Sequence, residues 1–516
     1  MPRRTVAVAL AVLLFLSGCK VRTVQQVPAA GLAQPLPAKQ MIVRVTTIKG
    51  ADVQFDPPGA AIKGATVSGV FKKSPVEVPL DQVQRFWVQT TEISTARTVG
   101  LVAGLTAGVV IVAVVAAEAS KKSTPAATTT TPCTGNNCVG SCPFVYSWDG
   151  TRYVFEAEPY GGAITRGLEK DDYSELAELK EEDGRYKLRM TNEVDETQMT
   201  NLTELLVVDH PAGTRVVPDI DGKLHTVSAP QALLSAHDAE GHDLLPWLRS
   251  ADHLIWEPPP VPDAGGNLQG DIVMTFPKPA GATKVKLVAN AATGLWGSYM
   301  IKKIVGLSGR EAGMFYFALN HSSSARKQLI AWEEREELYR LKVYVEEPTG
   351  WEVRGILPGT GAFNSADRIL PLDVSHVQGD QLRIRIHPPA GFWALNSFAV
   401  DYTPDRQVTV QKLKPATAQD LQGRDVLPEL ASVDGRYLAM PNIGDTADIA
   451  FLAPPARAGT DRAVFLHTRG YYKLHQSATG SPDKATLKAV EKIPGGAVRF
   501  AASQYGQMQV AEERVP

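Results

Sequence analysis

The sequence predicts a mainly β, multidomain chain with few helices, and three observations lead to this prediction. Apolar and polar residues alternate in several segments, most clearly where Leu382, Ile384 and Ile386 are interleaved with basic residues, and this two-residue period is typical of a half-buried strand. Asp-Gly pairs, which favour tight hairpin turns, recur at 149–150, 183–184, 221–222 and 434–435. The 516 residues, 44% of them hydrophobic, are enough for about three domains.

The amino terminus carries the features of an export signal. Arg3 and Arg4 precede an apolar run that ends at Leu16, and this run is too short to cross a bilayer as a helix, which takes roughly 20 residues. The sequence Leu16-Ser17-Gly18-Cys19 resembles the lipobox of bacterial lipoproteins. The resemblance implies that residues 1–18 are a cleaved signal peptide and that Cys19 is diacylated, and an ordinary secretory signal is the alternative. Inner-membrane lipoproteins tend to carry Asp after the cysteine, so Lys20 favours the outer membrane by the same resemblance.

Residues 19–39 are predicted to be a flexible tether, because they contain three prolines and little periodicity. Residues 40–96 follow with short strand-like pieces separated by Gly, Pro and Lys, among them MIVRVTTI and VEVPL. We therefore expect a small β-barrel-like module over 40–96, of a kind that packs or binds rather than catalyses.

The segment 97–119 is predicted to be an apolar helix. Residues 99–117 carry no charge and as a helix would reach about 28 Å, close to the thickness of a bilayer's hydrocarbon core. Gly100, Gly104 and Gly108 share one face, and this glycine-zipper pattern predicts self-association with a second helix. A transmembrane helix, an apolar helix docked on protein and a buried pair of strands all stay open, as does the side of the membrane that the C-terminal part faces.

Residues 120–142 form a linker rich in Thr and Pro that contains the cysteine cluster Cys133, Cys138 and Cys142. In an oxidising compartment, one local disulfide with one leftover thiol is the simplest interpretation, and the sequence does not select the pairing. A zinc site is not expected, because the nearest histidine along the chain is His210.

Two or three β-sandwich-like modules are expected after the linker, at 143–338 with helices, at 339–405 and at 406–516. The best helix candidates are Ser298–Val305 and Ser324–Leu338. The opening text, Ser141–Ala163, resembles the start of a domain in uncharacterised bacterial exported proteins, and no activity follows from that resemblance.

The module at 339–405 ends in GFWALNSFAVDYTP and resembles the closing half of a galactose-binding-like jelly roll. The resemblance implies sugar binding through exposed rings such as Trp351 or Trp393. Both faces of the last strand are apolar, however, so a buried core position is the preferred interpretation for Trp393.

The sequence offers few candidate catalytic or metal-binding residues. Glu156 and Glu158 lie on one side of a predicted strand and would suit acid–base catalysis or a hard cation, but an exposed strand edge is the preferred interpretation. His237, His242 and His253 are the densest group of potential metal ligands, yet their spacing does not place them on one helix face, so a polar loop is expected. The charged stretch WEEREEL is expected to be a solvated helix face. Because HExxH, GxSxG, Walker and dinucleotide motifs are absent from the sequence, we predict no catalytic, cofactor-binding or metal-binding residue.

The charge balance excludes one class of partner. The chain has 53 basic and 55 acidic residues and a net charge of -2, so nucleic acid is not an expected partner. We predict an envelope lipoprotein held by membrane lipid through Cys19, with a structural or binding role toward a polysaccharide or an envelope protein. A hydrolase acting on an envelope or extracellular polymer is the alternative, and it requires two carboxylates, or a histidine and a nucleophile, that meet in one cleft.

Overall fold

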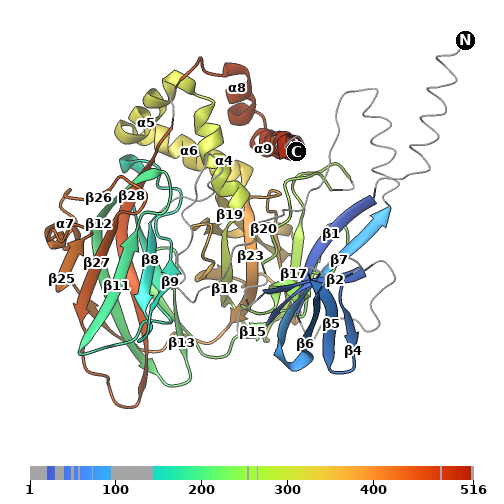
Figure 1. The fold of residues 1–516 in the computed structure, drawn as a ribbon, viewed down its shortest axis with the longest axis horizontal. Helices are drawn as coiled ribbons and strands as arrows, with labels where there is room; N and C mark the ends of the chain where they lie inside the picture. The colour runs from blue at the N-terminus through green and yellow to red at the C-terminus, as the bar shows by residue number, and fades with distance from the viewer. Residues whose placement is uncertain are drawn as a thin grey trace, which may run out of the picture. The chain divides into compact units, whose positions relative to one another are not determined.

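The computed structural model describes residues 20–28, 40–47, 52–55, 59–71, 74–93, 143–252, 255–263, 265–476 and 479–512. The chain divides into two compact units, Met1–Ser123 with Gln504–Pro516, and Thr124–Ser503 (Figure 1). The mainly β class is confirmed, with several sheets and few helices. Cys19, the cysteine cluster and the glycine zipper lie outside the described residues, so the lipid anchor, the disulfide and the apolar helix stay predictions. In the part of the chain that the structure describes, no helix has the length and apolar character needed to span a membrane.

The first unit contains two small antiparallel sheets. The larger has the order β1-β7-β2-β3 (Lys20–Pro28, Val83–Ile93, Gln40–Thr47, Asp52–Gln54), and the smaller has the order β4-β5-β6 (Ala61–Lys63, Thr66–Phe71, Ser74–Pro79). Ile42, Val45, Val67 and Phe86 are buried in its core. The tether predicted over 19–39 is wrong for its first part, since β1 pairs with β7 along its whole length. Backbone hydrogen bonds hold such an end strand, so apolar periodicity does not reveal it.

A β-sandwich that we name sandwich A is built from two distant stretches of the second unit, 144–211 and 409–474. One sheet has the order β25-β27-β11-β8-β9 (Thr417–Asp420, Thr446–Leu452, Arg185–Thr191, Phe144–Trp148, Tyr153–Ala157). The other has the order β10-β28-β12-β24 (Lys170–Glu175, Thr460–Leu474, Glu196–Pro211, Thr409–Leu413), and β26 (Leu438–Met440) also pairs with β12. Leu188, Leu205, Ile449 and Leu466 are among its buried core residues.

A second sandwich, sandwich B, is formed within residues 231–401. One sheet has the order β16-β17-β22-β19-β20 (Ser235–Asp238, Ile272–Pro277, Gln381–Ile386, Arg340–Glu347, Gly350–Pro358). The other has the order β15-β23-β18-β21 (Gln231–Ala232, Trp393–Asp401, Lys284–Thr293, Ala366–Asp373). Its core includes Ile272, Leu287, Ile384 and Phe398. The hairpin β13–β14 (Arg215–Pro218, Leu224–Val227) precedes it in the chain.

The predicted module boundaries at 338/339 and 405/406 do not coincide with these sandwiches. Sandwich B is inserted into sandwich A between β12 and β24, so the modules expected at 143–338, 339–405 and 406–516 each contribute strands to a sheet completed elsewhere. The alternation of apolar residues identifies strands, but it does not identify their partners. The pairings that close the sheets join residues hundreds of positions apart, such as Leu205 with Leu466.

The two sandwiches have the same strand order, and this order follows from a repeated sequence of strands. Residues 144–293 (repeat 1) and 340–474 (repeat 2) each contain a first half of five strands, β8–β12 or β19–β23, and a second half that begins with β15 or β24. In sandwich A, the first, second and fourth strands of the first half of repeat 1 (β8, β9 and β11) lie in one sheet, and the third and fifth (β10 and β12) flank β28, the last strand of repeat 2. In sandwich B, the equivalent strands β19, β20 and β22 of repeat 2 lie in one sheet, and β21 and β23 flank β18, the last strand of repeat 1. The halves are exchanged: the first half of repeat 1 pairs with the second half of repeat 2, and conversely.

The repeats also share sequence in the turn that follows β16 and β25. At a constant separation of 182 positions, Ala236, Asp238, Gly241, Asp243, Leu245, Pro246, Leu248, Ser250 and Asp252 recur as Ala418, Asp420, Gly423, Asp425, Leu427, Pro428, Leu430, Ser432 and Asp434. Oδ1 of Asp238 accepts the N–H groups of Glu240 and His242, and Oδ1 of Asp420 accepts those of Gln422 and Arg424. The glycines have φ of 82° and 77°, a conformation that glycine adopts without strain. The short helices α3 (Leu245–Leu248) and α7 (Leu427–Leu430) follow, each with its last leucine buried.

Helices α4 (Leu295–Gly306), α5 (Ala312–His321) and α6 (Ser323–Glu336) connect the two repeats and lie together in Figure 1. The helices predicted at Ser298–Val305 and Ser324–Leu338 correspond to α4 and α6. Helix α8 (Lys484–Lys492) and the beginning of α9 (Gly496–Glu512) follow repeat 2, and Val490 and Val498 join the core of sandwich B. Trp332 Nε1 of α6 donates to the Val490 carbonyl at 3.0 Å, which ties the two groups of helices together.

Candidate functional site

Equivalent segments of the two repeats meet where sandwich A contacts sandwich B. The segment EPYGGA (158–163) follows β9, and the segment LPGTGA (357–362) begins in the last two residues of β20 and continues beyond it. A Cβ on Gly161 would lie 2.7 Å from the Thr360 carbonyl carbon, and one on Gly361 would lie 2.3 Å from Glu158 Cδ. Only glycine permits this backbone approach, so the repeated glycines shape the junction.

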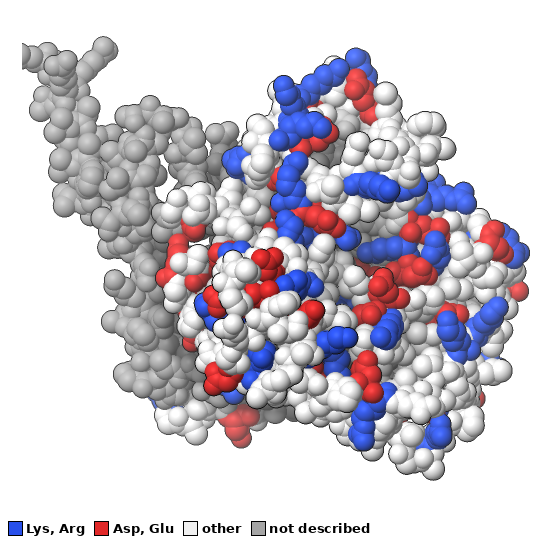
Figure 2. Space-filling view, turned by 180° about the vertical axis from the view of Figure 1, so that it is seen from behind, with Lys and Arg blue, Asp and Glu red and all other residues white. Residues whose placement is uncertain are grey.

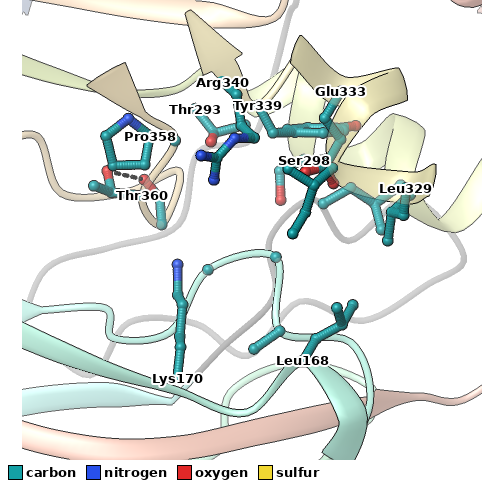
Figure 3. Close-up of a pocket in the computed structure, with 17 residues that line it drawn as sticks. Leu168, Lys170, Thr293, Ser298, Leu329, Glu333, Tyr339, Arg340, Pro358 and Thr360 are labelled. Carbon is teal, nitrogen blue, oxygen red and sulfur yellow. Dashed lines mark hydrogen bonds between the residues drawn. The ribbon is translucent and has the colours of Figure 1, made fainter. Parts of the chain in front are cut away.

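A cavity of about 190 Å³, the junction cavity, opens beside these segments (Figure 3). Sandwich A contributes Lys170 from β10 and Leu168, and sandwich B contributes Arg340 from β19 and Thr360. Helices α4 and α6 complete the wall with Ser298, Ile301, Leu329, Ile330 and Glu333. Two stretches that are far apart in the sequence, 161–170 and 293–361, therefore surround one space.

Two cationic groups point into the junction cavity from opposite sandwiches. Figure 3 shows the Lys170 ammonium and the Arg340 guanidinium directed toward the same space. The Arg340 Nε donates to Glu334 at 2.8 Å, which orients the guanidinium plane. Within the described residues, neither Lys170 Nζ nor the two terminal nitrogens of Arg340 has a recorded hydrogen-bond or ion-pair partner.

Glu333 is the acidic group of the junction cavity. Burial raises the pKa of its carboxyl to about 7, against the opposing influence of Arg340 and Lys170. The structure records no partner for its carboxylate oxygens among the described residues. Glu333 belongs to the WEEREEL stretch, where the prediction of a solvated helix face is wrong for Glu336 and Glu337, which are buried, and Glu333 is partly buried at the wall of the cavity.

Hydroxyl groups line the same wall. Thr293 and Ser298 are buried residues of β18 and α4, and no side-chain hydrogen bond is recorded for either in the described part of the chain. The Tyr339 hydroxyl donates to the Gly297 carbonyl at 2.8 Å, and burial raises its pKa well above the usual value, so this group stays a neutral donor. The junction cavity thus presents several polar groups that have no recorded partner among the described residues: the Lys170 ammonium, the terminal nitrogens of Arg340, the Glu333 carboxyl and the hydroxyls of Thr293 and Ser298.

A larger depression of about 530 Å³, the adjoining groove, continues from the junction cavity. The two share the lining residues Lys170, Arg340, Pro358, Gly359 and Thr360. Most carboxylates of the adjoining groove have partners: Asp172 binds Arg368 at 3.3 Å, Asp171 binds Arg469 at 2.6 Å, and Asp219 contacts His225 at 3.2 Å. These ion pairs hold the groove's walls, whereas the Lys170 ammonium and the terminal nitrogens of Arg340 have no recorded partner among the described residues.

Figure 2 shows acidic and basic side chains intermixed over the visible face of the second unit. No extended surface of one sign is apparent on that face.

The predicted carboxylate pair, Glu156 and Glu158, is buried, so the interpretation as an exposed strand edge is wrong. Glu156 accepts a hydrogen bond from the Ser147 hydroxyl and from the Glu178 N–H at 2.7 Å. Glu158 accepts from the Phe363 N–H at 2.6 Å, across the junction of the sandwiches. Each carboxyl has its own protein partners, and we assign both to structure rather than to catalysis.

The histidine group has a structural role where the structure describes it. His237 lies in β16, and His242 Nδ1 contacts Asp238 at 2.8 Å inside the repeated turn, where repeat 2 has Arg424 against Asp420. His253 lies outside the described residues. No group of three His, Cys, Asp or Glu side chains suited to a metal ion is found among the described residues.

The two tryptophans proposed from the jelly-roll resemblance differ in position. Trp393 is 1% exposed and its indole N–H donates to the Glu337 carbonyl at 2.8 Å, so this ring belongs to the core and is closed to a ligand. Trp351 is half-buried, with the Arg385 and Arg383 guanidinium carbons 5.0 and 5.6 Å from its ring centroid. Repeat 1 has the same arrangement in Arg189 over Tyr153, at 4.6 Å, which indicates a packing motif of both sandwiches.

Sequence reasoning did not identify Lys170, Glu333, Arg340 or Thr360. The one sequence feature that points to this site is the pair of similar glycine-containing segments at 158–163 and 357–362, which a comparison of the sequence with itself would reveal.

No protein-family model and no curated protein matches this chain. Among solved structures, the β-porphyranase of glycoside hydrolase family 86 from the gut bacterium Bacteroides plebeius is 8% identical, over 51% of this chain and 40% of that one, with a TM-score of 0.14. The family 31 α-xylosidase from Xanthomonas citri is 8% identical, over 86% of this chain and 35% of that one, with a TM-score of 0.13. This chain covers less than two thirds of either protein, and similarities this low carry no argument about fold or function.

Proposed function

We propose that this chain is a lipid-anchored binding protein of the bacterial envelope that holds a saccharide chain in the adjoining groove, with one sugar residue in the junction cavity. The observation that carries the proposal is a set of polar groups around one cavity that have no recorded partner among the described residues: Lys170, the terminal nitrogens of Arg340, Glu333, Thr293 and Ser298. Buried polar groups are normally satisfied by protein, water or ligand, so a cavity that collects them is suited to a polyhydroxylated ligand.

The shape of the site supports the same proposal. The groove's volume of about 530 Å³ falls within the roughly 300–1,000 Å³ typical of small-molecule sites. The cavity wall combines hydroxyls and charges with the apolar side chains Ile301 and Leu329. Such a mixture matches a sugar ring, which has polar edges and apolar faces.

The location is proposed from the sequence. The lipobox-like text before Cys19 supports export and acylation, and Lys20 supports the outer membrane. Replacing Cys19 with alanine should move the chain from the membrane fraction to the soluble fraction, unless the apolar segment 97–119 also holds it. Protein that stays unprocessed and unacylated by mass spectrometry would contradict the anchor.

A hydrolase is the second candidate, and Glu333 is the observation that favours it. A carboxyl whose pKa is near 7 holds a proton close to neutral pH, as a general acid requires. Release of reducing ends from a bound polysaccharide, abolished in Glu333→Gln, would favour the hydrolase over the binding protein.

Binding is tested with an array of soluble bacterial and plant oligosaccharides, followed by titration calorimetry of those retained. Ile301→Trp narrows the junction cavity and is expected to lower affinity at least tenfold, about 1.4 kcal/mol. Ile493→Trp, at an exposed position outside the site, is the matched control and should bind like the wild type. Retention of no oligosaccharide, or equal affinity of Ile301→Trp and wild type with both folded by circular dichroism, would refute the proposal.

A further inference from the structure

We infer that the junction cavity selects a sugar residue that bears a carboxylate, such as a hexuronic acid, over its neutral counterpart. This inference rests on the proposed function, and it adds the chemical class of the ligand. It follows from the arrangement of the charges around the cavity.

The cationic groups are arranged to hold one anion. Lys170 and Arg340 enter from opposite sandwiches and point into the same space (Figure 3). Because Glu334 engages only the Nε of Arg340, the terminal nitrogens stay directed toward the cavity. A guanidinium held in this way presents two parallel N–H groups that match the two oxygens of a carboxylate, and a lysine ammonium adds a second charge.

The neighbouring acidic groups do not cancel this charge. Four charged or titratable groups face Glu333: Arg340 from β19, Lys170 from β10, Glu334 from α6, and Tyr339, which follows α6. Glu334 is engaged with Arg340, and Tyr339 stays neutral. Below pH 7 Glu333 is mostly protonated, so two cations, Lys170 and Arg340, then stand against the single carboxylate of Glu334, and one net positive charge remains.

Glu333 therefore makes anion binding depend on pH. When the carboxyl loses its proton, it repels a ligand carboxylate and competes for Lys170 and Arg340. Affinity for an acidic sugar should fall severalfold between pH 6 and pH 8, and Glu333→Gln, which keeps the shape without the charge, should flatten this dependence.

The decisive experiment compares two matched probes by titration calorimetry on the full chain: an oligomer of galacturonic acid and the same oligomer with its carboxyl groups reduced to alcohols. The acidic oligomer should bind at least tenfold more tightly at pH 6, because hydrogen bonds to charged groups contribute about 1.5–3 kcal/mol, or roughly 10- to 150-fold. Lys170→Ala should reduce this ratio toward one. Lys284→Ala, an exposed lysine at the start of β18, should leave the ratio unchanged.

Each outcome decides a different point. Equal binding of the two probes overturns the carboxylate inference and leaves saccharide binding intact. Binding of neither probe, together with an empty oligosaccharide array, overturns the proposed function itself. A preference that survives in Lys170→Ala, or a pH dependence that survives in Glu333→Gln, also overturns the inference.

Discussion

Replacing Glu158 with glutamine should remove a large part of the pH dependence of folding. Glu158 is 5% exposed, and its Oε2 accepts from the Phe363 N–H of the other sandwich, whereas its Oε1 has no recorded partner. Burial raises the pKa of its carboxyl from 4.5 to about 8. The folded protein therefore keeps a neutral carboxyl at this junction at pH 7, where the unfolded chain has a carboxylate.

The direction of the effect follows from the number of bound protons. Between pH 4.5 and 8 the folded state binds one proton that the unfolded state has lost, so stability falls as the pH rises through this window. The slope approaches 1.4 kcal/mol per pH unit, which gives about 3 kcal/mol between pH 5 and pH 8. The stabilisation from the protonated Glu158 carboxyl is fully present below pH 4.5, its pKa in the unfolded chain. It is lost as the pH rises through about 8, its pKa in the folded protein.

The assay is urea unfolding at pH 5, 6, 7 and 8, followed by tryptophan fluorescence, for the wild type and Glu158→Gln. The amide has the size of the protonated acid and does not titrate, so the variant should gain about 3 kcal/mol relative to the wild type between pH 5 and pH 8. Glu491→Gln, on the exposed surface of α8, should follow the wild type at every pH. A constant difference between Glu158→Gln and wild type over this range would show that the buried carboxyl is ionised and refute the reasoning.

Three further predictions concern the exchanged architecture. A protease site inserted between His321 and Ser322 should yield two fragments that co-elute in native buffer and separate only in denaturant, because each sandwich contains strands of both, and separation in native buffer would contradict the exchange. Gly361→Ala should lower stability by about 1–3 kcal/mol, because its Cβ would overlap Glu158, whereas Gly306→Ala, with no atom near its Cβ, should change the melting temperature little. Leu248→Ala and Leu430→Ala should each cost about 2–5 kcal/mol in urea unfolding, and their effects should add, since the two leucines belong to separate cores.

The strands themselves were largely predictable from the sequence. Leu382, Ile384 and Ile386 are all buried, and the basic residues between them point away from the core, as their alternation predicts. Helix α6 was predictable as well, since helix-forming residues follow Ser322, whose hydroxyl caps the helix by accepting the Ala325 N–H. Local patterns determine such elements, so a local interpretation is sufficient for them.

The pairing of the strands was not predictable in the same way. Periodicity does not distinguish a strand's partner within its own repeat from the equivalent strand of the other repeat, because both present the same apolar face. The predicted boundary at 405/406 therefore separated β12 from β28, which pair along most of their length. The repeated turn at 235–252 and 417–434 was the available signal, because the two segments share residues at a constant separation.

The candidate site was hidden for a related reason. Lys170 occurs in a run of charged residues, and Glu333 occurs in another, so neither differs from a solvated residue in the sequence. Their significance comes from the fold, which brings Lys170 of β10 to the cavity that Glu333 and Arg340 line from neighbouring positions at the end of α6 and the start of β19. Charges that acquire their environment through tertiary contacts leave no local pattern.

Because the halves are exchanged, a ligand in the junction cavity would also stabilise the junction between the two sandwiches. The segments 158–163 and 357–362 occupy equivalent places in two sandwiches, and the exchange brings them into backbone contact. A ligand in the junction cavity would contact Lys170 of repeat 1, Glu333 of the connecting helices and Thr360 of repeat 2 at once. Since such a ligand binds only when all three are in place, its binding free energy should add directly to the stability of the junction. Saturating ligand should therefore raise the urea concentration at which both sandwiches unfold, and Gly361→Ala, which disturbs the junction and not the charged groups, should weaken binding in proportion to its loss of stability.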